Sequence, residues 1–320
     1  MRLGFLGNFI PPHSTENDRA WSFRKLGHEV VQFQESATTA AQLLDAMPDL
    51  DMLIYSHTHD PSYVVDGLAD VFRVYANCEI PTVSAHLDRW LWLARESDMG
   101  VEATWSTEHL FMADMSPEMV EKLTQLGIVD RAHYLAPGVV ERDCYMAEPD
   151  HSKYPHPIVF VGSRGYHPEY AWRPAMIDSM KRIYGKDFGH YGGDGIASLR
   201  GHDLNVLMAT AEVVVGDSCF GGRPYYASDR VMETRGRGGF LLHPYVEGVD
   251  MTGVGLYDPC DVDSLRSQID YYRNRPGERE AMRFLGHEHV KAHETYTNRS
   301  QEMIDQVFPY NIDGLVGWCD

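Results

Sequence analysis

The chain has 320 residues, of which 43% are hydrophobic and 23% are charged, a composition typical of a globular protein with a sizeable core. Its formal net charge of −19 argues against a large non-specific DNA footprint, which needs a basic face, but leaves room for a local basic cleft. No apolar run approaches the ~20 residues that a membrane-spanning helix needs.

The segment Met1–Gly7 is too short for a secretory signal and carries no cleavage pattern, so we expect a cytoplasmic protein. The 5 cysteines are odd in number and scattered, and no C-x-x-C motif occurs. The sequence therefore indicates neither a disulfide framework nor a zinc knuckle.

The first half alternates predicted strands and helices. Apolar runs predict strands at 2–6, 29–33, 52–55, 80–84, 110–112 and 133–135, and helices at 15–26, 39–46, 63–76 and 117–126. This alternation is typical of βαβ units and a parallel sheet, in which ligands bind beyond the carboxyl ends of the strands. The rule places Gly7, Asn8, the loop 57–60 and the segment 86–88 along one rim.

The segment 148–157 contains three prolines and many polar residues, which is typical of a linker. A second series follows it. Strands are predicted at 158–161, 188–191, 212–215 and 240–242, and helices at 173–184, 204–210, 261–272, 278–292 and 298–307. Two similar strand–helix halves joined by a linker predict two domains.

The stretch Ser228–Tyr245 concentrates the residues with ligand-binding chemistry. A helix is expected to open near Ser228 and Asp229, whose short polar side chains suit a cap. Arg230 and Glu233 would share one face of it. Helix-start amides and Arg230 could hold a diphosphate, and Glu233 could accept two ribose hydroxyl hydrogens. A surface ion pair is the alternative interpretation.

The order of motifs in the second half resembles the donor domain of GT-B glycosyltransferases. The segments that carry the resemblance are Val159-Phe160-Val161-Gly162, Asp203-Leu204-Asn205, Ser228–Glu233, Gly238–Leu242 and His293–Arg299. The sequence is most similar to the spore-maturation-protein-like group, which includes many bacteriophage-encoded glycosyltransferases. The likeness covers roughly residues 130–308 and, in the first half, mainly Gly4–Asn8 and His13–Asn17.

The resemblance implies an α/β fold of two Rossmann-like parallel-sheet domains that face each other across a cleft. Residues 1–152 would be the acceptor-side domain, 153–295 the nucleotide-sugar donor domain, and 296–320 a helix and tail that pack back toward the first domain. The implied donor-binding residues are Gly162, Ser163, Arg164, Asp217, Ser218, Arg230 and Glu233. Guanidinium groups and helix-start amides would stabilise the leaving diphosphate, so that neither a metal nor another cofactor is required.

One departure from the family affects the donor sugar. Retaining members carry two glutamates eight residues apart. Glu233 matches the second, but Tyr225 stands at the position of the first. Donor-sugar contacts and stereochemistry therefore do not carry over, and we expect Gly221, Gly222 and Arg223 to supply part of the missing contact.

Residues on the rim of the first half are the candidates for catalysis and acceptor binding. His86 and Asp88 would activate the acceptor hydroxyl, because that step benefits from a nearby base, and Arg164 completes the predicted catalytic set. The acceptor-side candidates are Gly7, Asn8, His13, Ser14 and His57. Helix capping alone would explain Ser14, and a structural role would explain His86.

We therefore predict a metal-independent glycosyltransferase that uses a nucleotide sugar, such as a UDP-sugar. The acceptor would be a modified DNA base or a virion protein, in the host cytoplasm if the chain is phage-encoded. The acidic composition favours a protein or small-molecule acceptor. One alternative is a metal-dependent hydrolase that uses His57, His59 and Asp60. Another is a nucleotide-sugar-binding module without turnover, for which Tyr225 is the main support.

Overall fold

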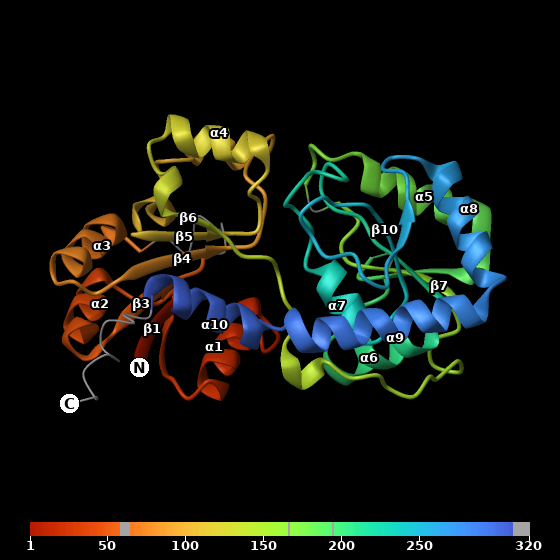
Figure 1. Ribbon diagram of the computed structural model, residues 1–320, viewed down its shortest axis with the longest axis horizontal. Coiled ribbons are helices and arrows are strands. Elements are labelled where there is room, and N and C mark those ends of the chain that lie inside the picture. Colours follow the sequence, from red (N-terminus) through yellow and green to blue (C-terminus); the bar gives the residue numbers. More distant parts are fainter. Residues whose placement is uncertain (58–64, 166, 194, 310–320) are drawn as a thin grey trace, which may run out of the picture.

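The computed structural model of the chain describes residues 1–57, 65–165, 167–193 and 195–309, arranged as two lobes (Figure 1). Each lobe contains one parallel sheet. The first sheet has the strand order β2-β1-β3-β4-β5-β6, and the second has the order β11-β10-β9-β7-β8. The predicted α/β class with two Rossmann-like parallel sheets is confirmed.

The first lobe follows the predicted alternation closely. Its strands are β1 Arg2–Gly7, β2 Glu29–Gln34, β3 Met52–Tyr55, β4 Thr82–His86, β5 His109–Met112 and β6 Ala132–Tyr134. Its helices are α1 Thr15–Lys25, α2 Ala40–Ala46, α3 Leu68–Asn77 and α4 Pro117–Gln125. Local chemistry sets these bounds. Ser14 caps α1 by accepting a hydrogen bond from the Asn17 amide at 3.1 Å, and Gly27 follows the helix with φ of 87°.

The second lobe contains the remaining strands and most of the remaining helices. Its strands are β7 Ile158–Val161, β8 Phe188–Tyr191, β9 Val213–Val215, β10 Leu241–Pro244 and β11 Gly255–Tyr257. Helices α5 Trp172–Tyr184, α6 Gly201–Thr210, α7 Arg230–Gly236, α8 Val262–Arg273 and α9 Pro276–His293 surround them. Strand β11 was not predicted. The strand has only three residues, and one of them is exposed, so the sequence contains no apolar run that would predict it.

The last helix, α10 Tyr296–Val307, returns to the first lobe and lies beside α1 (Figure 1). Met303, Ile304 and Val307 pack into the same core as Leu3 and Phe5 of β1. The chain therefore crosses between the lobes twice, after β6 and between α9 and α10. The domain boundaries at 152 and 295 stay predictions.

The start of α7 differs from the prediction. Asp229, at the N-cap position, already has helical dihedrals and makes no capping hydrogen bond. The Ser228 hydroxyl instead donates to the Asp217 carbonyl at 3.2 Å. The expectation that these two side chains cap α7 is therefore wrong, because tertiary contacts occupy the Ser228 hydroxyl.

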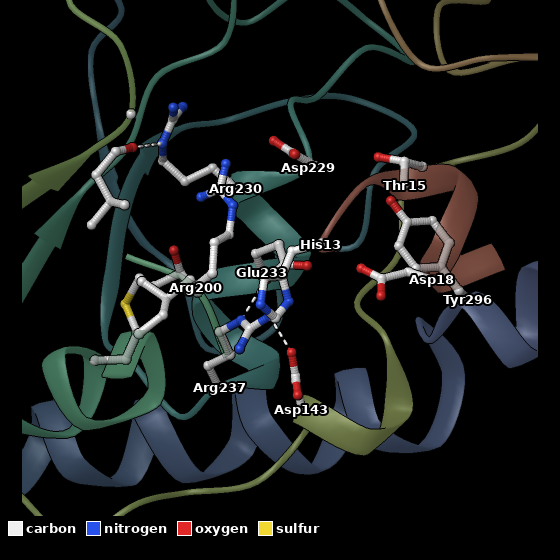
Figure 2. Close-up of a pocket in the computed structure, with 15 residues that line it drawn as sticks. His13, Thr15, Asp18, Asp143, Arg200, Asp229, Arg230, Glu233, Arg237 and Tyr296 are labelled. Carbon is white, nitrogen blue, oxygen red and sulfur yellow. Dashed lines mark hydrogen bonds and ion pairs between the residues drawn. The ribbon is translucent and has the colours of Figure 1, made fainter. Parts of the chain in front are cut away.

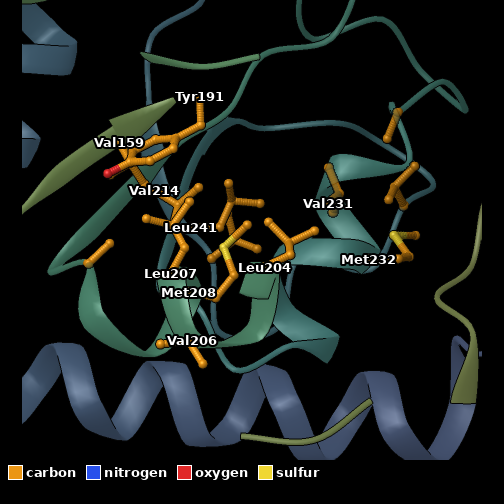
Figure 3. Close-up of a cluster of buried hydrophobic side chains, with 14 of the residues drawn as sticks. Val159, Tyr191, Leu204, Val206, Leu207, Met208, Val214, Val231, Met232 and Leu241 are labelled. Atoms are coloured by element: carbon orange, nitrogen blue, oxygen red, sulfur yellow. The ribbon is translucent and has the colours of Figure 1, made fainter. Parts of the chain in front are cut away.

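Both sheets reverse their strand order beside their first strand, between β1 and β3 and between β7 and β9. Loops leave such a point in opposite directions and open a crevice beyond the carboxyl ends of the strands. In the second lobe, Val159, Val214 and Leu241 from three adjacent strands pack against Leu204 and Met208 of α6 and form the floor beside this crevice (Figure 3).

Candidate active site

Two adjoining pockets lie between the lobes. The glutamate pocket, of about 200 Å³, contains Glu233, and the histidine pocket, of about 440 Å³, contains His57 and His86. Thr15, Arg200, Asp229 and Arg230 line both pockets. The two pockets therefore form one continuous cleft, and both lobes contribute to its walls.

Arg230 lies at the strand-order reversal of the second sheet. Its Nε donates to the Val161 carbonyl at the end of β7 at 3.0 Å, and its Nη1 donates to the Asp217 carbonyl beyond β9 at 3.0 Å. The guanidinium also lies 4.8 Å from the centre of the Phe160 ring. Burial lowers the pKa of Arg230, and the Asp217 carboxylate opposes this effect. One cation is thus fixed where the two strands diverge.

The Asp217 carboxylate holds the Arg230 side chain in this position. It is fully buried and pairs with Arg173 at 3.1 Å and with Arg230 at 3.4 Å. Ser218 is buried as well, and its hydroxyl accepts a hydrogen bond from the Ser228 amide at 3.0 Å. These two residues position the site and line neither pocket.

Glu233 lies one helical turn after Arg230 and projects into the glutamate pocket (Figure 2). Its Oε2 accepts a hydrogen bond from Arg237 Nε at 2.5 Å, whereas none of the described residues hydrogen-bonds to Oε1. Arg237 in turn donates to Asp143 at 2.9 Å and to Asn205 at 2.6 Å. Burial raises the pKa of Glu233, and Arg237 opposes this effect. A rigid carboxylate therefore presents one oxygen to the pocket.

The first lobe and α10 supply the opposite wall of the glutamate pocket. Thr15 and Asp18 of α1 and Tyr296 of α10 lie across from α7 (Figure 2). Asp18 pairs with Arg142 at 2.6 Å. Burial, with the nearby carboxylates of Glu233 and Asp143, raises the pKa of Asp18 to about 7.

The histidine pocket contains the rim of the first sheet. Buried His86, at the end of β4, stacks at a tilt on Trp90 with 5.1 Å between ring centres. Asp88 pairs with Arg95 at 3.6 Å. His57 Nδ1 contacts the buried carboxylate of Glu35.

Glu16 lies in the same pocket and accepts a hydrogen bond from the Ser56 hydroxyl at 3.1 Å. Burial raises the pKa of Glu16. Two imidazoles and two carboxylates of the first lobe therefore face the second lobe here.

Comparison with solved structures matches this two-lobed arrangement over nearly the whole chain. HepE from Anabaena, solved with UDP and glucose, is 13% identical, has a TM-score of 0.65, and aligns over 97% of this chain and 100% of its own. An α-glucosyltransferase solved with UDP-glucose and DNA containing an abasic site is 12% identical, has a TM-score of 0.66, and aligns over 96% and 99%. The chain has the GT-B fold.

Other comparisons bear on parts of the chain. Residues 173–305 match the family model described as glycosyl transferase-like. The T4 phage BGT, solved with its UDP-glucose substrate, shares the GT-B fold at 10% identity, with a TM-score of 0.58 and alignment over 97% and 100% of the two chains. The chain matches no curated protein sequence.

The GT-B cleft brings together eight of the predicted site residues. Those that line it are Gly162, Ser163, Arg230, Glu233, His13, His57, His86 and Asp88. Gly7 lies close behind the cleft, where an added Cβ would come within 2.7 Å of the Glu16 side chain. Ser14 caps α1, Asn8 interacts with Gln34, and neither residue lines either pocket.

Arg164 is the clearest departure from the prediction. Its guanidinium pairs with Asp178 of α5 through bonds of 2.7 and 2.5 Å, and it lines neither pocket. The resemblance implied that Arg164 lies in the first loop of the donor domain under a diphosphate, and Arg164 was also part of the predicted catalytic set. Asp178, in the helix that follows this loop, instead holds the Arg164 guanidinium at the surface.

The loop after β9 contacts the first lobe. Tyr225 adopts φ of 53°, and its carbonyl accepts a hydrogen bond from the Met115 amide of the first lobe at 3.2 Å. Arg223 reaches Glu118 at 3.4 Å, and Gly221 and Gly222 lie beside Pro259. None of these residues lines either pocket, and the loop joins the lobes. The expectation that 221–223 supply part of the contact of the missing glutamate stays a prediction.

The predicted metal-dependent alternative depends on His59 and Asp60, which lie outside the described residues. Within the described ranges, no group of three or more His, Cys, Asp or Glu side chains could hold a metal ion. In the same ranges, no helix is long and apolar enough to cross a membrane.

Several cleft residues were missed by sequence reasoning. They are Glu16, Asp18, Asp143, Arg173, Arg200, Asp229 and Arg237. The four-residue spacing of Glu233 and Arg237 on one helix could have indicated their pairing. Asp229 directly precedes Arg230 in the chain. The other five reach the cleft through the packing of separate elements, so no local pattern marks them.

Proposed function

We propose that this chain is a glycosyltransferase that moves a sugar from a nucleoside diphosphate to an acceptor hydroxyl in the cleft. The observation that carries the proposal is Arg230, fixed at the strand-order reversal with Glu233 one turn further along the same face. The glycosyl transferase-like match includes both residues. The structures with the same fold include proteins solved with UDP or UDP-glucose.

The donor diphosphate would lie where the two pockets meet. Arg230 and Arg200 line both pockets there, and Arg173 lines the histidine pocket. Gly162 leaves room for the Arg230 guanidinium at the end of β7, because an added Cβ would lie 2.6 Å from Arg230 Nη2. Guanidinium groups bind phosphate oxygens in a planar fork and keep their charge throughout the reaction. They would stabilise the charge that develops on the departing diphosphate without needing a metal ion.

The ribose would lie against Glu233. Its Oε1 is open to the pocket, and an ionised carboxylate accepts hydrogen bonds from two neighbouring hydroxyls. Arg237 fixes the orientation of the carboxylate from the other side. The apolar side chains of Leu204 and Met208 line the same pocket and provide a surface for the base.

The acceptor hydroxyl would enter from the first lobe into the histidine pocket. His86 and Asp88 lie there on the end of β4 and the following loop, where a base can take the hydroxyl proton as the new glycosidic bond forms. In its more specific form, the proposal places the chain in the spore-maturation-protein-like group. The acceptor would then be of the phage type, such as a modified DNA base or a virion protein.

A panel of nucleotide sugars tests the proposal. We expect UDP or a related nucleotide to bind in a calorimetric titration, and one nucleotide sugar to be hydrolysed slowly without an acceptor. Glu233→Gln should weaken nucleotide binding by about tenfold or more, because a hydrogen bond to a charged group contributes about 1.5–3 kcal/mol. Glu121→Gln, at an exposed position of α4, is the matched control.

Two results would count against the proposal in different ways. Wild-type affinity in Glu233→Gln and in Arg230→Ala would remove the proposed donor site. Tight nucleotide binding without hydrolysis or transfer of any sugar in the panel would favour the binding module without turnover.

A further inference from the structure

The negative charge of the chain is concentrated in the acceptor-side half. Residues 1–152 contain 10 Lys and Arg against 24 Asp and Glu, which gives a net charge of −14. The whole chain carries −19, so residues 153–320 contribute only −5. The half that would bind the acceptor therefore has a strongly negative electrostatic field.

The two halves also differ in the charged side chains that they contribute to the cleft. The acceptor-side half contributes carboxylates to its walls, namely Glu16, Asp18, Asp88 and Asp143, and no Lys or Arg of its described residues lines either pocket. The donor half contributes Arg173, Arg200, Arg230 and Arg237 against Asp229 and Glu233. The donor wall therefore offers arginines to an anion. The described residues of the acceptor wall offer no Lys or Arg of their own, and arginines already pair with Asp18, Asp88 and Asp143.

Two arginines of the acceptor-side half already pair with carboxylates of the cleft. Arg95 pairs with Asp88 at 3.6 Å, and Arg142 pairs with Asp18 at 2.6 Å. Neither cation is available to a phosphate unless it leaves its carboxylate. A nucleic acid, by contrast, is held chiefly by Lys and Arg side chains that neutralise its backbone phosphates and release counterions.

We infer that the acceptor is a hydroxyl group on an uncharged or positively charged molecule, a polypeptide side chain rather than a nucleic acid. This inference rests on the proposed function, because the donor site defines which wall faces the acceptor. A serine or threonine flanked by lysines would meet the carboxylates of the rim, whereas a DNA duplex would bring its phosphates against a half of the chain with a net charge of −14. A free neutral sugar offers the same uncharged hydroxyl, so the test includes one.

The test compares acceptors that differ only in charge. Three serine-containing peptides, flanked by two lysines, two glutamines or two glutamates, are assayed with a neutral sugar and a duplex containing hydroxymethylated bases. Transfer from the nucleotide sugar is measured at about 50 mM and about 1 M salt. Where a compound is not glycosylated, its effect on donor hydrolysis is measured, because an acceptor in the cleft competes with water.

We expect the lysine peptide to exceed the glutamate peptide by about tenfold or more in kcat/KM at low salt, or in potency as an inhibitor of donor hydrolysis. The difference should largely disappear at high salt, where the Debye length falls to about 3 Å. Equal or reversed ranking of the peptides, or a duplex that outperforms all of them, would overturn the inference. If the enzyme uses the neutral sugar in preference to every peptide, the acceptor hydroxyl does not belong to a polypeptide. Failure of UDP and the related nucleotides to bind would instead reject the proposed function.

A pair of variants localises the effect to the cleft. Asp88→Asn removes a carboxylate and leaves Arg95 unpaired, so the ratio between the lysine and glutamate peptides should fall by about threefold or more. Tyr226→Phe changes an uncharged residue of the same pocket and should leave this ratio unchanged. A ratio that responds equally to both variants would show that the preference does not arise from the charge of this wall.

Discussion

Replacement of Gly162 by alanine should damage the donor site. Gly162 follows β7 and adopts φ of 136°, a conformation that side-chain-bearing residues rarely take. An added Cβ would also lie 2.6 Å from Arg230 Nη2. The substitution therefore acts on the backbone of the loop and on the central cation together.

The two effects have comparable size. Holding a residue other than glycine in this region costs about 1–3 kcal/mol. Moving the guanidinium away would break a bond to the Val161 or Asp217 carbonyl, and a hydrogen bond from a charged group contributes about 1.5–3 kcal/mol. We expect unfolding stability to fall by about 3 kcal/mol and nucleotide affinity to fall by about tenfold or more, since 1.4 kcal/mol corresponds to tenfold.

Gly165 provides the matched control, because it lies in the same loop and an added Cβ would meet nothing within 4 Å. Urea unfolding measures stability, and titration with UDP measures affinity under conditions where both variants are folded. Gly165→Ala should stay within about 0.5 kcal/mol of the wild type. If Gly162→Ala kept wild-type stability and UDP affinity, neither the backbone strain at position 162 nor the position of Arg230 beside it would be as described.

Three further predictions concern pH and packing. UDP-glucose affinity, measured by calorimetry, should fall as pH rises through about 7, because burial raises the pKa of Asp18 to about 7 and the ionised carboxylate repels a diphosphate. The Asp18→Asn variant should show a flatter dependence of affinity on pH. A wild-type affinity that does not change with pH would contradict this prediction. Burial lowers the pKa of His243 to about 4, so the unfolded chain binds a proton first and about 3 kcal/mol of stability is lost as pH falls from about 6.5 to 4. Urea titrations should show a smaller loss in His243→Gln; an equal loss would assign it to other groups. Met303→Ala in α10 should cost about 2–4 kcal/mol of unfolding free energy, with exposed Gln306→Ala as control, and equal values would mean that α10 does not stabilise the first lobe.

The sequence by itself determined the elements and their order. Short apolar runs define the central strands, and Ser14 and Gly27 bound α1 through contacts within a few residues. Arg230 and Glu233 share a face for the same local reason, since the helical repeat places residues three apart side by side. Periodicity of this kind also predicted the parallel sheets, and with them the edge at which ligands bind.

Only the tertiary structure decided which charged side chains meet. Arg164 belongs to the predicted loop, yet Asp178 of α5 holds it away from the cleft. Asp18 reaches the cleft from α1, and its environment includes Glu233 from the other lobe, which no local spacing could reveal. The physical reason is that an ion pair or a pocket depends on distance in space, whereas the patterns legible in a sequence extend over only a few helical turns or one strand.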